Sequence, residues 1–185
     1  MTILPGPGAV IPGAPGLGPG VLAAAHAAPT GPLYTTLLLL HVLCAVIGFG
    51  ATAVTGAQAA RVRRGPTAPG ADGVRRYFRP GVNWAGRTLY GVPVFGFALV
   101  ADSDHAFAAG DRFVVVGLLV WLAAALAAEV VVWPDERRIQ EAVSERWGDP
   151  ATAEDLDRRC RRVARTGVVL PVLFVAAVVV MVGKP

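Results

Sequence analysis

The first 60 residues contain no Asp, Glu, Lys or Arg, and they include an uninterrupted uncharged run at residues 33–57. A membrane-spanning helix needs about 20 predominantly apolar residues. Three further apolar segments follow, at residues 82–101, 113–133 and 166–183. This pattern predicts an all-α, polytopic membrane protein, a bundle of four transmembrane helices within residues 33–183.

Composition and the N-terminal segment support this division of the chain. Only 16% of the residues are charged, against about 25% in a typical soluble domain. With two cysteines, the chain has neither a disulfide framework nor a paired-cysteine zinc site. Residues 1–32 hold seven prolines and seven glycines, a composition that disfavours regular structure. We therefore expect residues 1–32 to form a disordered tail.

The positive charges are concentrated in two of the connections between apolar segments. Together with Arg87, residues 61–81 and 134–165 hold 15 of the 17 basic residues. Arginine-rich loops favour the cytoplasmic side of a membrane. This distribution predicts a bacterial inner-membrane protein in the lipid bilayer with both termini outside, and it is not typical of a nucleic-acid-binding face.

The second arginine-rich connection has helical periodicity. Ile139, Val143 and Trp147 recur every four residues, which predicts one apolar stripe of an amphipathic helix. Thr152 and Asp155 have the spacing of a capping box, so a second helix is expected to start there and continue into the last span. These helices could lie at the membrane surface or dock a cytoplasmic partner.

One face of the first span carries small residues. Small side chains let membrane helices approach closely, so this face predicts packing inside the bundle. His41 lies on the same face. The predicted packing residues are Ala45, Gly48, Thr52 and Gly56.

His41 and Cys44, three residues apart, could together bind a soft metal such as copper. Met181 and His105 fall at a similar depth, toward the outer half of the bundle, and complete a candidate metal-ligand set. The alternative is a buried histidine bonded to a neighbouring helix, beside a cysteine that acts as a small apolar residue. Haem is disfavoured because only His41 lies within a predicted span.

Arg87 and Glu129 are the charged residues inside the predicted spans. Counted from the inner ends of their segments, both lie at about the same depth, 6–7 Å at 1.5 Å per residue. Charges in hydrocarbon are usually paired or functional. We therefore predict an intramembrane ion pair, with a proton relay or snorkelling to the interface as alternatives.

Three segments carry a family resemblance: LLLLHVLCAVIGFG at residues 37–50, YGVPVFG at residues 90–96, and residues 121–134. They resemble an uncharacterised bacterial integral-membrane family, a domain of unknown function related to the CopD-like copper-resistance proteins. The resemblance covers residues 33–183. Its relation to CopD-like proteins implies copper handling by analogy.

Two functions remain open at this point. One is the binding or passage of a metal ion in the outer half of the bundle. The other is a non-catalytic role as an interaction protein or accessory subunit, with a membrane protein partner or further copies of the same chain. Enzymatic activity is not expected, because no acid–base pair has a plausible catalytic placement.

Overall fold

The computed structural model describes residues 31–104 and 106–183, and within these residues all regular structure is helical. The predicted all-α class is therefore confirmed. Residues 1–30 lie outside the described part, so the predicted disorder of the tail stays a prediction. The helices are α1 (Pro32–Val62), α2 (Ala71–Tyr77), α3 (Trp84–Arg87), the 3₁₀ turn η1 (Thr88–Tyr90), α4 (Gly91–Ala101), α5 (Arg112–Ala127), the π-helix η2 (Ala128–Val132), α6 (Trp133–Glu145) and α7 (Pro150–Gly183).

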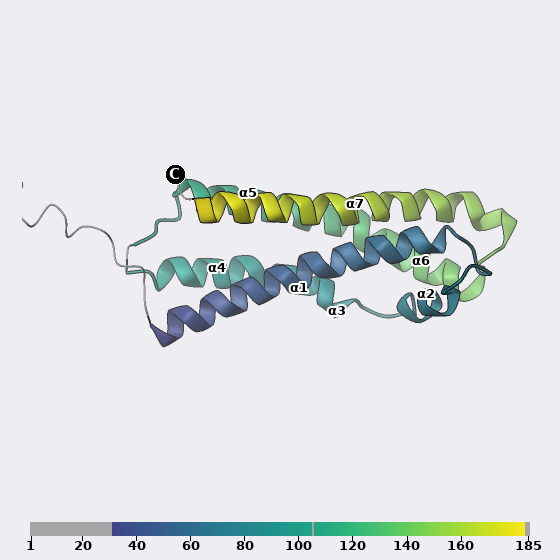
Figure 1. Ribbon diagram of the computed structural model, residues 1–185, viewed down its shortest axis with the longest axis horizontal. Coiled ribbons are helices and arrows are strands. Elements are labelled where there is room, and N and C mark those ends of the chain that lie inside the picture. Colours follow the sequence, from purple (N-terminus) through teal and green to yellow (C-terminus); the bar gives the residue numbers. More distant parts are fainter. Residues whose placement is uncertain (1–30, 105, 184–185) are drawn as a thin grey trace, which may run out of the picture.

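The helices run alternately along one long axis (Figure 1). α1 leads away from the end where the described chain begins, and α3, η1 and α4 return beside it. α5, η2 and α6 then run in the direction of α1, and α7 returns the chain to the starting end.

Among the residues that the structure describes, three helices rather than the predicted four are long and apolar enough to span a membrane: Pro32–Val62, Arg112–Glu145 and Pro150–Val179. The expectation of a fourth long helix at residues 82–101 is wrong because that segment is divided among α3, η1 and α4. The Asn83 side chain accepts a hydrogen bond from the Gly86 amide and fixes a helix start inside the segment. Pro93 lacks an N–H, and the 3₁₀ turn directly precedes its helix.

The long helices exceed their predicted spans. α1 extends to Val62, and the helix through Trp133 continues into α6. α7 begins at Pro150, so the predicted continuous entry into the last apolar segment is confirmed. The predicted capping box is wrong: the Asp149 carboxylate accepts a hydrogen bond from the Ala151 amide at 2.9 Å, whereas Asp155 forms ion pairs with arginines.

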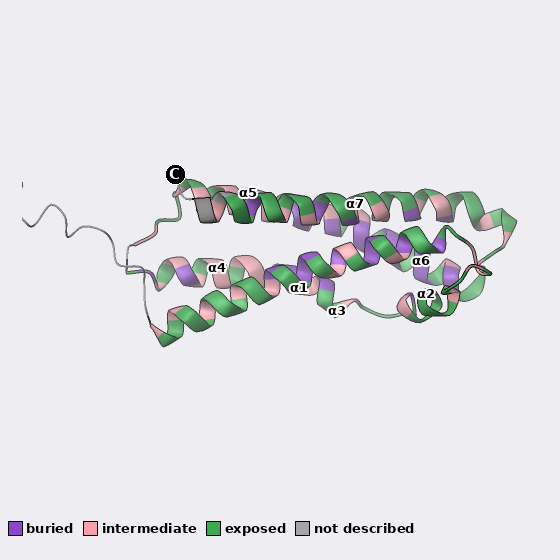
Figure 2. Ribbon diagram, viewed as in Figure 1, coloured by how far each residue is buried: buried purple, intermediate pink, exposed green. Residues whose placement is uncertain are grey.

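α1 and α7 are in direct backbone contact. A Cβ atom added to Gly56 would lie 2.8 Å from the Cα atom of Gly167. The outer faces of the long helices carry exposed apolar residues, among them Leu39, Leu119 and Val172. Figure 2 shows the exposed positions in green along α7 and the first half of α1. This combination of close helix contact and an apolar exterior is the expected arrangement for helices in lipid.

At the other end of α1, a second apolar core joins α2, α6 and the first half of α7. We call this part of the molecule the cap. Ile139 and Val143 are buried in it, as their spacing predicts, and the Trp147 indole donates a hydrogen bond to the Val62 carbonyl at 3.3 Å. The cap core consists of Ala59, Val62, Val74, Phe78, Ile139, Val143, Leu156, Cys160 and Val163.

Candidate functional site

The structure brings Arg87 and Glu129 together where α3 meets η2. A guanidinium nitrogen of Arg87 lies 3.9 Å from Oε1 of Glu129, and the Tyr90 hydroxyl donates a hydrogen bond to the same oxygen. The Arg87 guanidinium also lies over the Trp133 ring, 3.6 Å from its centroid. Two charges and two aromatic rings therefore form one constellation, which we call the Arg87–Glu129 site.

The π-helix that carries Glu129 has a local cause. Pro134 is the second residue after it, and proline has no N–H to donate to the carbonyl of Val130 four residues earlier. A wider turn is one way in which a membrane helix adapts to a proline. No signal in the sequence other than Pro134 indicates this π-helix.

The Arg87–Glu129 site lies at the surface of the bundle. The side chain of Glu129 is 51% exposed and that of Arg87 is 26% exposed. On the same helical run, Leu122 and Leu126 are exposed apolar residues. The ion pair is thus accessible from the apolar exterior and is not enclosed between helices.

A second polar cluster, which the sequence analysis did not identify, links the cap to α1. The hydroxyls of Thr55 and Tyr77 are 2.6 Å apart, and the Asn83 amide nitrogen donates to Thr55 at 3.3 Å and to the Glu136 carboxylate at 3.1 Å. Burial raises the pKa of the Tyr77 hydroxyl, so it remains protonated at neutral pH. The available signal was the pair of acids directly after the apolar segment, Asp135 and Glu136.

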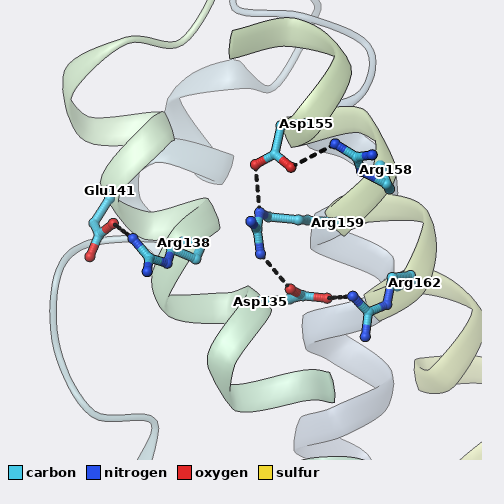
Figure 3. Close-up of polar contacts among 7 residues, drawn as sticks. All are labelled: Asp135, Arg138, Glu141, Asp155, Arg158, Arg159 and Arg162. Atoms are coloured by element: carbon cyan, nitrogen blue, oxygen red, sulfur yellow. Dashed lines mark hydrogen bonds and ion pairs between the residues drawn. The ribbon is translucent and has the colours of Figure 1, made fainter. Parts of the chain in front are cut away.

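A third polar cluster joins α6 to α7 (Figure 3). Asp135 is only 3% exposed, and its carboxylate is 2.9 Å from Arg159 and 3.6 Å from Arg162. Arg159 also binds Asp155 at 2.7 Å, and so it lies between two carboxylates. Buried charges are stable only when they are paired; the cluster therefore holds the two cap helices in one register.

Among the candidate metal ligands, His41 and Cys44 both face α4. His41 Nδ1 donates a hydrogen bond to the Val92 carbonyl at 2.9 Å, since a carbonyl oxygen can only accept. A Cβ atom added to Gly91 would lie 2.6 Å from the Cys44 sulfur. His41 is therefore hydrogen-bonded to a neighbouring helix, as the alternative to metal binding predicts. Cys44 packs as a small residue against Gly91.

The remaining candidate ligands are not shown beside this pair. Met181 packs against Gly117 of α5, and His105 lies outside the described residues. Across residues 31–104 and 106–183, no group of three or more His, Cys, Asp or Glu side chains could hold a metal ion. The structure therefore brings together two of the four predicted ligands.

The small residues predicted for helix packing are buried. A Cβ atom added to Gly48 would lie 2.9 Å from the backbone nitrogen of Leu89, so α1 also approaches η1 closely. Thr52 donates its hydroxyl to the Phe49 carbonyl at 2.7 Å and exposes no unpaired polar group to the contact. The buried set includes all four predicted members, Ala45, Gly48, Thr52 and Gly56.

Comparison with known proteins identifies a family without an assigned activity. No curated protein and no solved structure matches the chain. The family match gives no link to CopD-like proteins and no support for copper binding. Residues 35–185 match the model of the family described as "Predicted integral membrane protein (DUF2269)", and the chain belongs to this family.

Proposed function

We propose that this protein is a non-catalytic interaction subunit of the bacterial inner membrane, whose arginine-rich cap docks a partner protein with an acidic surface on the cytoplasmic side. The observation that carries the proposal is the cap itself. The cap is a packed unit that has its own apolar core and the buried Asp135 cluster. A loop that only connected two helices would need neither the core nor the cluster.

Charge on the cap indicates the chemistry of the partner. Arg63, Arg138 and Arg158 are among the arginines paired with acids of the cap. Other exposed arginines have no acidic partner within salt-bridge distance among the described residues, and an acidic protein surface would complement them. They are Arg61, Arg64, Arg75, Arg76, Arg79, Arg137, Arg146 and Arg165.

The proposed topology keeps four crossings although three of the described helices are long enough to span a membrane. α1 and α5 run in the same direction, so the chain must return between them, and α3, η1 and α4 are the segment that does so (Figure 1). We therefore propose that α3, η1 and α4 together form the fourth crossing, in addition to the three long helices. The described chain then begins and ends on the side opposite the cap, which supports external termini.

Photocrosslinking in intact cells tests the proposal. We would place a photoreactive residue at Arg64 or Arg76 on the cap, and at Val172 on the exposed face of α7 as a control. The expected result is a discrete protein adduct from the cap positions, which disappears when Arg79 is replaced by Glu. An unchanged adduct in Arg79→Glu, or adducts from Val172 alone, would contradict docking at the cap.

Metal analysis separates this function from the metal hypothesis. Protein expressed with copper available and purified in mild detergent should contain copper far below one atom per chain. Stoichiometric copper that is lost in both His41→Asn and Cys44→Ser would instead establish a metal-binding protein.

A further inference from the structure

We propose that the Arg87–Glu129 site binds the headgroup of a phospholipid of the phosphatidylethanolamine class in the leaflet next to the cap. Arg87 would donate hydrogen bonds to the lipid phosphate, and Glu129 would accept a hydrogen bond from the primary ammonium. This inference concerns the lipid-facing surface and is independent of the proposed docking role of the cap.

The surface around Glu129 is apolar and exposed. Leu126 and Leu122 lie three and seven residues before Glu129, and they are 56% and 45% exposed. Val94 and Phe97 of α4, four and seven residues after Tyr90, are 64% and 51% exposed. Charged side chains in a membrane usually face the bundle interior, so a half-exposed carboxylate between two apolar stripes requires a specific explanation.

Aromatic residues indicate the depth of the site. Tyr90 and Trp133 contact the ion pair directly, and Trp84, one helical turn before Arg87, is 75% exposed. Tyr and Trp are enriched at the level of the lipid headgroups. The site therefore lies at the depth of the phosphate and ammonium groups of lipid headgroups. The two exposed apolar stripes extend from it away from the cap, where lipid acyl chains can cover them.

The ion pair retains unused hydrogen-bonding capacity. Its 3.9 Å separation exceeds the roughly 2.7–2.9 Å of a charge-assisted hydrogen bond. Arg87 and Tyr90 both approach Oε1 of Glu129, whereas Oε2 accepts no hydrogen bond from any residue that the structure describes. Trp133 covers one face of the guanidinium, and this cation–π contact engages none of the guanidinium N–H groups in a hydrogen bond.

Charge complementarity selects the headgroup. A phosphate alone would satisfy Arg87 but would lie beside the Glu129 carboxylate, and like charges repel. Phosphatidylglycerol lacks an ammonium, and the ammonium of phosphatidylcholine is trimethylated and cannot donate a hydrogen bond. Phosphatidylethanolamine offers a phosphate and an N–H donor on a short linker, opposite in sign to the two protein charges.

Lipid competition on the wild-type protein tests the proposal without any substitution. The protein is placed in nanodiscs with equal amounts of phosphatidylethanolamine, phosphatidylglycerol and phosphatidylcholine with matched acyl chains, and lipids retained after release are counted by native mass spectrometry. We expect phosphatidylethanolamine to be retained about tenfold over either competitor, the change produced by one charge-assisted hydrogen bond. Equal retention, or preferential retention of phosphatidylglycerol, would overturn the proposal.

Three variants localise the effect. Glu129→Gln should remove the preference over phosphatidylcholine, and Arg87→Gln should remove retention of phosphatidylethanolamine. Tyr90→Phe removes the hydroxyl that binds Glu129 but keeps both charges, so the preference should persist. As a matched control, the exposed cap pair Arg138 and Glu141, 3.5 Å apart, is neutralised with no expected change. If the control abolishes the preference as Glu129→Gln does, the site assignment is wrong.

Discussion

Gly56 of α1 and Gly167 of α7 meet backbone to backbone, with a Cβ at Gly167 placed only 2.7 Å from the Cα atom of Gly56 and 2.8 Å from the Thr52 carbonyl oxygen. These neighbours are backbone atoms and cannot rotate away as a side chain could. The contact therefore sets the distance between α1 and α7, and it depends on the absence of two side chains.

Gly167→Ala should destabilise the bundle by about 1–3 kcal/mol, the usual cost of overpacking a filled interior. The measurement is thermal unfolding in mild detergent. Gly50→Ala in α1 is the control, because a Cβ atom at Gly50 would have no neighbour within 4 Å. It should be neutral or stabilise by up to about 1 kcal/mol through helix propensity. Equal losses in the two variants would show that α1 and α7 do not touch here.

The Arg87–Glu129 pair should behave as a coupled unit. Glu129→Gln should lower the unfolding temperature because it leaves the Arg87 charge without its partner, and adding Arg87→Gln should recover part of the loss. A coupling free energy of about 1–2 kcal/mol is expected from a double-mutant cycle. Strictly additive losses would mean that the two charges do not interact in the protein.

Asp135 should be a stability determinant of the cap. Asp135→Asn leaves Arg159 and Arg162 with a neutral group in a buried position, and the expected loss is about 1–3 kcal/mol, less than for a fully enclosed pair since both arginines are partly exposed. Glu141→Gln breaks an exposed ion pair and should change stability by less than about 0.5 kcal/mol. In Asp135→Asn, hydrogen exchange should become faster in α6 and the first half of α7 than in the wild type. An equal change in protection in all helices would contradict a role of Asp135 in the cap.

A proline and a tryptophan on neighbouring helices should also be coupled. Pro93 cannot donate to the Leu89 carbonyl in an α-helical pattern, and the Trp121 indole donates to that oxygen at 2.8 Å. Trp121→Phe should therefore cost about 0.5–1.5 kcal/mol, the usual net value of one hydrogen bond, because the Leu89 carbonyl keeps only the contact with the Gly91 amide. In a Pro93→Ala background the new N–H can serve the same oxygen, so Trp121→Phe should cost less. Equal costs in both backgrounds would exclude this compensation.

Reporter fusions check the topology. Fusions after Gly70 and after Gly148 should read cytoplasmic, and a fusion after Ala108 should read external, because the arginine-rich segments lie on the cap side. An external reading at Gly148 would invalidate the orientation. A cytoplasmic reading at Ala108 would show that α3, η1 and α4 do not cross the bilayer.

The features that were predictable from the sequence are those with a regular period or a long uniform run. The apolar segments predicted α1, α5 and α7, and the four-residue spacing of Ile139 and Val143 predicted the buried stripe of α6. The break at residues 82–101 was not predicted, because it depends on a local hydrogen bond from Gly86 to Asn83 and on Pro93. An analysis of apolar runs and periodicity covers many residues at once and does not detect a break that one or two residues cause.

The polar clusters also differ in how far the sequence predicts them. Equal depth in antiparallel segments placed Arg87 opposite Glu129, since depth can be counted along a helix. The Asn83–Glu136 and Asp135–Arg159 contacts join residues 53 and 24 positions apart at helix ends, where the crossing geometry decides which side chains meet. That geometry follows from glycine contacts such as Gly56 with Gly167, which no charge pattern reveals.

The two unbroken helical runs have a mechanical consequence. Arg112–Glu145 and Pro150–Gly183 each contain 34 residues, and each is about 50 Å long at 1.5 Å per residue, against a hydrocarbon core of about 30 Å. Both runs pass from the apolar bundle into the cap without an intervening loop. A tilt of the cap relative to the bundle would therefore tilt both helical runs along their length.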